Sequence, residues 1–101
     1  MEQRYQATLE VNKEPVDLNP FIEQFVARTT AGAVSALRGA ENIESLELSV
    51  RHGDVTVTVN GKDIEVTLFP NEILASTLTG MVSSLRGIGP IDSMGISVKV
   101  T

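Results

Sequence analysis

The sequence predicts an α+β domain in which a largely antiparallel sheet of about six strands is covered on one face by two helices. Two kinds of segment support this class: short stretches in which apolar and polar residues alternate, and two longer stretches with apolar residues at helical spacing. Along the chain they follow the order ββαβ–ββαβ. A length of 101 residues fits one domain, 1–101.

An internal repeat is the second feature of the sequence. Residues 11–50 align with residues 59–98 at a constant offset of 48, without a gap, and 15 of the 40 positions are identical. Roughly two or three identities are expected by chance. The segment Ala31–Gly39, AGAVSALRG, recurs as TGMVSSLRG. We therefore expect two pseudo-symmetric repeats, approximately 4–51 and 52–101, related by a two-fold axis.

Alternation of apolar and polar residues locates the strands. They are expected at Tyr5–Val11, around Val16 to Leu18, and at Leu46–Val50, Val55–Val59, Ile64–Leu68 and Met94–Val100. Pro15 has no backbone N–H, so the second strand is expected at a sheet edge. The order of the strands within the sheet stays open, because several arrangements satisfy these connections.

Two tight turns determine how the middle strands pair. Asn60-Gly61, between alternating segments, is the strongest short hairpin signal and predicts a type I′ turn with positive φ at both residues. A second two-residue turn is expected at His52-Gly53. The registers that follow are Val57–Ile64, Val55–Val66, Val50–Val55, Leu48–Val57 and Arg51–Asp54. Both turns bring the apolar residues of neighbouring strands to the same face.

The two helices are expected to begin at Asn19-Pro20 and at Phe69-Pro70. Asparagine is a favoured N-cap and proline suits the first helical position. Arg38 and Arg86 are expected in the last helical turns, where a cation complements the helix dipole. Each arginine is followed by a glycine, which is typical of the residue after a helix.

Each predicted helix has a glycine at the equivalent position, Gly32 or Gly80. A glycine within a helix costs about 1 kcal/mol relative to alanine, so we expect a packing reason for both. Small residues surround each glycine on the helical wheel, beside the aliphatic stripe. We therefore expect the helices to lie side by side on one sheet face, with Gly32 and Gly80 close together.

Composition argues against several classes of function. Without cysteine, the chain has neither a disulfide framework nor thiolate chemistry. A net charge of −5 and a pI of about 4.7 argue against nucleic-acid binding, which needs clustered Lys and Arg. No apolar segment approaches the length of a membrane span, and no signal peptide is visible. A cytoplasmic protein is therefore expected.

No constellation of catalytic residues is visible, so we expect neither enzymatic activity nor a cofactor. His52, the only histidine, lies in a turn without a nucleophile beside it. Ser35 and Ser83 recur in both repeats, but they lie opposite the apolar stripes and are expected to face solvent. Gly87-Ile88-Gly89 follows a helix, whereas phosphate-binding loops precede one.

Two groups of charged residues are candidates for ligand binding. Arg38 and Arg86 are equivalent in the repeat and form a candidate anion pair across the pseudo-axis. Glu47, Asp63 and Glu65 fall on the polar sheet face and are candidates for a divalent, Ca-like cation, which takes several oxygen ligands. The alternatives are helix capping by the arginines and a solvated acidic face.

These observations favour a non-catalytic binding or assembly module. Its expected partner is another protein or a second copy, associating through a strand edge. The alternative is a protein that binds a small ligand or a divalent cation, on the acidic sheet face or at the pseudo-two-fold axis. We expect no nucleic-acid and no membrane partner.

Overall fold

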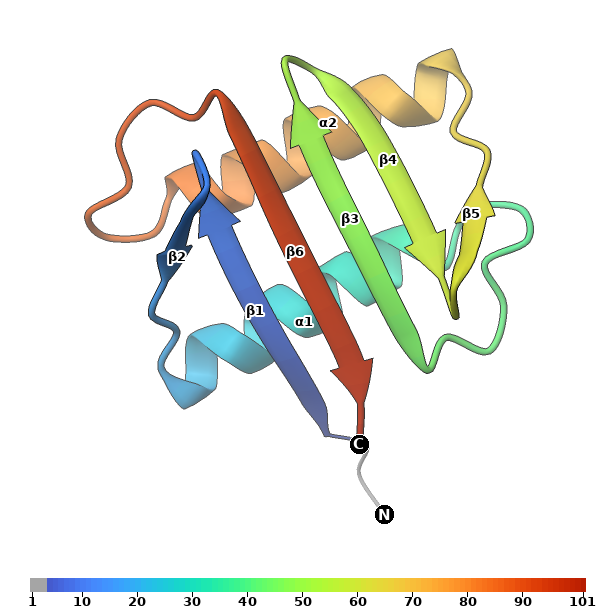
Figure 1. The fold of residues 1–101 in the computed structure, drawn as a ribbon, viewed down its shortest axis with the longest axis horizontal. Helices are drawn as coiled ribbons and strands as arrows, with labels where there is room; N and C mark the ends of the chain where they lie inside the picture. The colour runs from blue at the N-terminus through green and yellow to red at the C-terminus, as the bar shows by residue number, and fades with distance from the viewer. Residues whose placement is uncertain (1–3) are drawn as a thin grey trace.

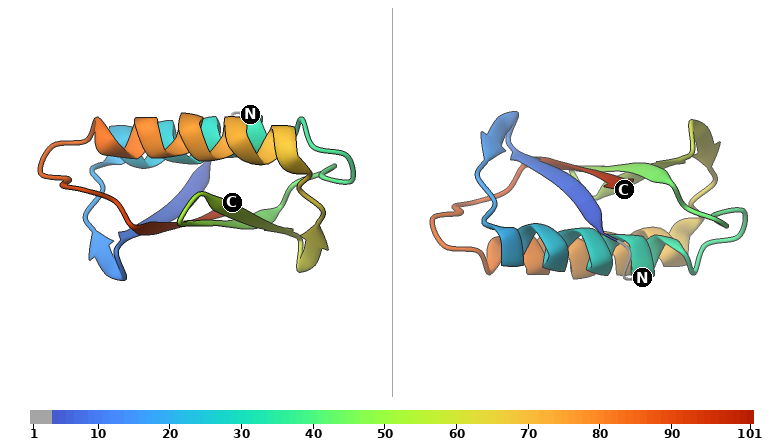
Figure 2. Two further views of the ribbon diagram at one scale, coloured as in Figure 1. Left: turned by 90° about the horizontal axis from the view of Figure 1, so that it is seen from above. Right: turned by 90° about the horizontal axis from the view of Figure 1, so that it is seen from below.

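The computed structural model describes residues 4–101, and it consists of one sheet layer and one helix layer (Figure 1). All neighbouring strands are antiparallel, and both helices cover the same face of the sheet (Figure 2). The elements are β1 (Tyr5–Val11), β2 (Glu14–Val16), α1 (Pro20–Val34), β3 (Ser45–Arg51), β4 (Asp54–Val59), β5 (Lys62–Ile64), α2 (Leu68–Ser83) and β6 (Ser93–Val100). The predicted α+β class is confirmed.

The sheet order, which the sequence left open, is β2-β1-β6-β3-β4-β5. Replacing each element by the one 48 residues away only reverses this order. At the centre, β3 pairs with β6, and Leu48 lies opposite Ile96, its own equivalent. Each hairpin therefore borders the last strand of the other half: β1 pairs with β6, and β4 pairs with β3.

The core lies between the sheet and the helices, because every second residue of the long strands points toward the helix layer. The largest fully buried side chains come from β3, β6, α1 and α2: Leu46, Leu48, Leu78, Ile96, Val26, Val34, Val82, Val98 and Thr30. In the described residues, 4–101, no helix covers the opposite sheet face (Figure 2).

The predicted turns form as expected. Asn60 and Gly61 have φ of 52° and 80°, and His52 and Gly53 have φ of 49° and 83°. Four of the predicted pairs are present: Val57–Ile64, Val50–Val55, Leu48–Val57 and Arg51–Asp54. The fifth, Val55–Val66, does not form, because β5 ends at Ile64.

Asparagine side chains fasten the loops that follow the helices. The Asn12 Oδ1 accepts hydrogen bonds from the backbone N–H groups of Asp92 (2.7 Å) and Ser93 (3.1 Å), and its Nδ2 donates to the carbonyl of Pro90 (2.9 Å). Asn60 makes the equivalent bonds in the other half, to Glu44 N–H (2.8 Å), Ser45 N–H (3.0 Å) and the carbonyl of Asn42 (2.9 Å). Each hairpin thus holds the loop that leads into the strand beside it.

The helix N-termini agree with the prediction to within a residue or two. The Asn19 Oδ1 accepts from the N–H of Ile22 at 2.8 Å, as an N-cap does. α2 begins at Leu68, one residue before the predicted Phe69, and its N-cap Thr67 makes no side-chain capping bond.

The helix C-termini differ from the prediction. α1 ends at Val34 and α2 at Ser83, so Arg38 and Arg86 lie in the turns beyond and do not cap the helices. The chain tightens there through hydrogen bonds from Leu37 N–H to Val34 and from Leu85 N–H to Val82. These bonds span three residues instead of four, which turns the half-buried leucines inward and ends the helix.

The predicted contact between Gly32 and Gly80 is wrong. The helices do lie side by side on one face, but they run in opposite directions (Figure 1), which places their C-terminal halves at opposite ends of the layer. Both glycines are exposed, and a Cβ built on either would meet nothing within 4 Å. They face away from the sheet, and neither allows a close approach within the molecule.

Candidate functional site

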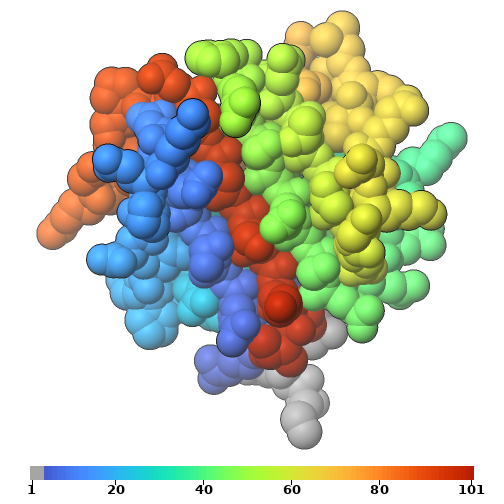
Figure 3. All heavy atoms as spheres, in the orientation of Figure 1, coloured from blue at the N-terminus to red at the C-terminus, as the bar shows by residue number. Residues whose placement is uncertain are grey.

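The open sheet face is shaped as a shallow trough. The edge strands β2 and β5 bend away from the helix layer, so they form walls on either side (Figure 2). Between them lies a hollow of about 440 Å³, on the face that Figure 3 shows. We name it the open-face hollow, and it is lined by Thr8, Leu9, Glu10, Pro15, Glu47, Leu48, Ser49, Thr56, Thr58, Gly95, Ile96 and Ser97.

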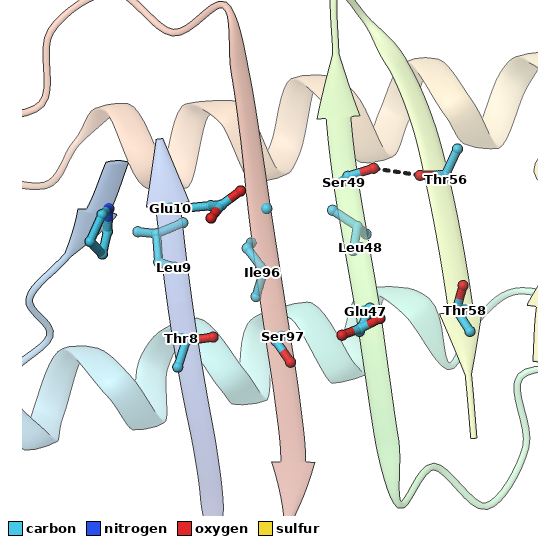
Figure 4. A pocket seen from close by; sticks show the side chains of 12 residues that line it. Thr8, Leu9, Glu10, Glu47, Leu48, Ser49, Thr56, Thr58, Ile96 and Ser97 are labelled. Atoms are coloured by element: carbon cyan, nitrogen blue, oxygen red, sulfur yellow. Dashed lines mark hydrogen bonds between the residues drawn. The ribbon is translucent and has the colours of Figure 1, made fainter. Parts of the chain in front are cut away.

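Two rows of side chains cross the sheet at this hollow, and neighbouring residues in a row come from neighbouring strands. One row runs through Glu10, Gly95, Ser49 and Thr56. The other runs through Thr8, Ser97, Glu47, Thr58 and Asp63. The Ser49 and Thr56 hydroxyls hydrogen-bond each other (Figure 4), and the Thr58 hydroxyl donates to Asp63 Oδ1 at 3.2 Å. The lining is thus mainly hydroxyl groups with carboxylates among them.

Two carboxylates in the hollow have no partner within residues 4–101. Glu10 points across β6 (Figure 4), and its Cγ is 3.4 Å from the place that a Cβ on Gly95 would take. Glu47 lies on β3 between Ser97 and Thr58. Both glutamates are exposed. They can accept hydrogen bonds from a cationic or hydroxyl-bearing ligand.

The candidate cation ligands do not converge. Glu47 and Asp63 lie on opposite sides of Thr58, so their backbones are two strand spacings apart, about 10 Å. Glu65 follows the end of β5. In the described part of the chain no three or more His, Cys, Asp or Glu residues come close enough to share a metal ion.

The candidate anion pair is also separated. Arg38 and Arg86 lie in the turns that follow α1 and α2. Because the helices are antiparallel, these two turns lie on opposite sides of the molecule (Figure 1). The structure does not bring the two guanidinium groups together across the pseudo-axis.

The remaining polar candidates have local roles. His52 is exposed in the turn between β3 and β4, and its backbone N–H donates to the carbonyl of Asp92 at 3.2 Å. Ser35 and Ser83 are exposed, as predicted, and their hydroxyls donate to the carbonyls of Gly32 and Gly80.

The sheet edges are covered by side chains that sequence reasoning missed. In the first half, Glu23 Oε2 accepts from Ala7 N–H at 2.9 Å, and Gln24 Nε2 donates to the Tyr5 carbonyl at 2.6 Å. In the second half, Asn71 alone bonds Val55 N–H (2.8 Å) and the Gly53 carbonyl (2.7 Å). These bonds satisfy the parts of β1 and β4 that extend beyond the short strands β2 and β5. Little free edge is left for an added strand.

The helix layer, formed by α1 and α2, exposes large apolar side chains. They are Phe21 and Phe25 on α1 and Leu68, Phe69 and Ile73 on α2. Phe21 and Phe25 contact each other, with ring centroids 6.1 Å apart. The signal was present in the sequence, because Phe21 and Phe69 are identical in the repeat. It was missed because aromatic residues on a helix usually belong to the core.

The helix layer is also poor in charge. The chain has 21 charged residues, but only Glu23, Arg28 and Glu72 lie among the 31 helical residues, which leaves 18 for the other 70. The Glu23 carboxylate accepts a hydrogen bond from the edge of β1, and the Arg28 guanidinium lies 5.2 Å from the centre of the Tyr5 ring. A solvent-facing helix ordinarily carries charged residues on its outer face.

Neither helix in residues 4–101 combines the length and the apolar composition that crossing a membrane requires. Comparisons of this chain with models of protein families, with curated proteins and with solved structures give no match.

Proposed function

We propose that the protein is a non-catalytic assembly module that docks onto protein through its helix layer. One observation carries this proposal: large apolar side chains are exposed on a surface that is nearly free of charge. Leu68 is 77% exposed, Phe21 72% and Phe69 68%. The core of a protein interface has this composition, with aromatic residues enriched and charged residues depleted.

The covered sheet edges support the helix layer over a strand edge as the docking surface. In a two-residue hairpin the hydrogen-bonded pairs alternate, so the middle residue of each edge strand points its backbone groups outward. In β2 that residue is Pro15, which has no N–H to donate. In β5 it is Asp63, which offers one N–H and one carbonyl. An added strand would gain few hydrogen bonds.

The test compares the wild type with the variant Phe21→Ser/Phe69→Ser, using light scattering and binding of an apolar fluorescent dye. A docking surface is either covered, and the protein associates, or uncovered, and the dye binds. The variant should lose whichever property the wild type shows. Thr56→Ala, on the open sheet face, is the matched control and should lose neither. A wild type that stays monomeric at millimolar concentration and binds no dye contradicts the proposal.

A second candidate function is binding of a small cationic ligand in the open-face hollow, supported by the unpartnered carboxylates of Glu10 and Glu47. A thermal-shift series with calcium chloride and with short linear diamines tests it, because a ligand that binds the native state raises its melting temperature. The rise should disappear in Glu10→Gln/Glu47→Gln. Equal shifts in wild type and variant count against this candidate.

We also infer that the two halves arose by duplication within the chain. The 15 identities at one offset support this, together with a sheet order that is unchanged by exchange of the halves. The side-chain hydrogen bonds of Asn12 and Asn60, which we name the asparagine clamps, support it further. Their backbone partners are themselves 48 residues apart.

A further inference from the structure

We infer that the occupant of the helix layer is a second copy of this chain, packed face to face so that the bulky half of each helix lies on the small half of a helix in the other copy. This inference rests on the proposed docking function and adds the identity and the geometry of the partner.

Each helix is divided into a bulky half and a small half. On α1, Phe21 and Phe25 are followed by Thr29 and Gly32, and by exposed Arg28, whose guanidinium lies over the Tyr5 ring at the side of the helix. On α2, Phe69 and Ile73 are followed by Thr77 and Gly80, 48 residues later in each case. Because a Cβ on either glycine meets nothing within 4 Å, the space directly beside each glycine is open to a partner.

The antiparallel helices place these halves diagonally. The bulky half of α1 lies beside the small half of α2, and the bulky half of α2 beside the small half of α1 (Figure 1). A second copy turned over about a two-fold axis in the plane of the layer brings its bulky halves over the small halves of the first. This is true for an axis along the helices and for an axis across them. The surface is therefore complementary to itself, as the interface of a two-fold dimer must be.

The apolar area is sufficient for a dimer. With about 200 Å² for a large side chain, the five exposed residues present about 600 Å² in one copy. Covering them in both copies removes about 1,200 Å² from water, the lower end of the range for specific interfaces. Backbone and small side chains around the glycines add to this area.

Electrostatics allow two copies to meet at this surface in spite of the net charge of −5. Of the charged residues, only Glu23, Arg28 and Glu72 lie on the helices, so the layer itself carries a net charge of about −1. The remaining acids of residues 4–101 lie on the strands and in the loops outside the two helices.

The first experiment fills the small halves with Gly32→Gln/Gly80→Gln. Glutamine favours helix more than glycine does and meets open space in the single copy, so the fold should not lose stability. In the dimer it occupies the place of the partner's phenylalanines. Light scattering should give twice 10.8 kDa for the wild type and 10.8 kDa for the variant at the same concentration. Phe21→Ser/Phe69→Ser should raise the dimer Kd by about 100-fold or more, as loss of hot-spot residues does.

The second experiment uses the absence of cysteine from the chain. Phe25→Cys protein is mixed with Gly32→Cys or with Gly80→Cys protein and oxidised, and Thr56→Cys on the open sheet face serves as control. A disulfide from position 25 to position 32 supports the two-fold axis across the helices. A disulfide from position 25 to position 80 supports the axis along the helices. Cross-links only at position 56, or a glutamine variant that dimerises like the wild type, overturn the inference. A monomeric wild type that binds the dye also overturns it while leaving the docking function intact, whereas a monomer that binds no dye removes both.

Discussion

The two halves of the molecule have the same arrangement of elements. Some of the side chains that stabilise it are the same in both halves, and others differ. Residues 4–51 and 52–101 both fold as two strands, a helix and a strand. The loop that follows each helix is held by an asparagine, Asn12 or Asn60, with the same three bonds. The strand edge is held by Glu23 and Gln24 in one half and by Asn71 in the other.

This difference shows which contacts restrict the residue type. Asn12 and Asn60 both have φ of 52° and must also accept and donate hydrogen bonds with one short side chain. Asparagine is the residue that combines tolerance of positive φ with both kinds of bond. The strand edge needs only one acceptor and one donor within reach of a helix, which a longer side chain can supply from a different position.

The largest expected effect is the loss of either asparagine clamp. Asn12→Ala and Asn60→Ala should each lower the free energy of unfolding by about 3 kcal/mol, from three exposed hydrogen bonds and the strain of positive φ. Chemical denaturation of both variants measures this. Asn12→Gly and Asn60→Gly relieve the strain and should cost about 1 kcal/mol less. If the two alanine variants differ by more than about 1.5 kcal/mol, the clamps are not equivalent.

Next in size is the removal of the exposed helical glycines. Gly32→Ala/Gly80→Ala should raise the free energy of unfolding by about 2 kcal/mol, the sum of two helix-propensity terms, because an added Cβ meets open space. Unfolding is to be followed in dilute solution, so that association does not contribute. The single variants should add up, since the glycines lie at opposite ends of the layer. A destabilised or strongly non-additive double variant would instead restore the helix contact expected from the sequence.

Thr30 and its equivalent Leu78 provide the third comparison. Both are fully buried, but the Thr30 hydroxyl has no hydrogen-bond partner within residues 4–101. Thr30→Val keeps the shape and removes the unpaired hydroxyl, so it should stabilise the fold by about 1 to 2 kcal/mol. Thermal unfolding of this variant, with half-buried Thr29→Val as control, checks the value. A melting temperature below that of the wild type would show that the hydroxyl has a partner in solution.

The smallest expected effect is at the helix N-termini. Asn19→Ala removes a capping bond and should cost about 1 kcal/mol, whereas Thr67→Ala should cost close to nothing, because Thr67 makes no such bond. Thr67→Asn should add up to about 1 kcal/mol, since Thr67 already has extended N-cap geometry. Equal losses in the two alanine variants would mean that Thr67 caps α2 in solution.

Local geometry could be predicted from the sequence where a single residue type dictates it. The Asn60-Gly61 and His52-Gly53 turns and the Asn19 cap depend on neighbouring residues only, and all three form as predicted. The ends of the helices could not be predicted in this way. Leu37 and Leu85 fit the helical pattern, but they turn inward through three-residue hydrogen bonds that depend on the core beneath them.

The predicted pairs of site residues required short distances between the two repeats, and the sequence repeat does not give those distances. Arg38 and Arg86 are equivalent in sequence, yet a two-fold axis places equivalent groups close together only if they lie near the axis. The pair that does lie there is Leu48 with Ile96, in the core. Gly32 and Gly80 show the same error, because a strip of small residues looks alike whether it faces a neighbouring helix or solvent.

The position of β6 has a consequence for how the chain folds. This strand follows every other described element along the sequence, yet it lies between β1 and β3 and pairs with both along almost its whole length. Tyr5 lies opposite Val100, so the pairing joins residues almost a full chain length apart. Without β6, β1 pairs only with β2, and β3 pairs only with β4, so these two groups of strands are not joined in one sheet. Non-local pairing of this kind slows folding, because a long loop must close before the contacts form. The six-stranded sheet can therefore be completed only after β6 has been synthesised, however early the two hairpins form.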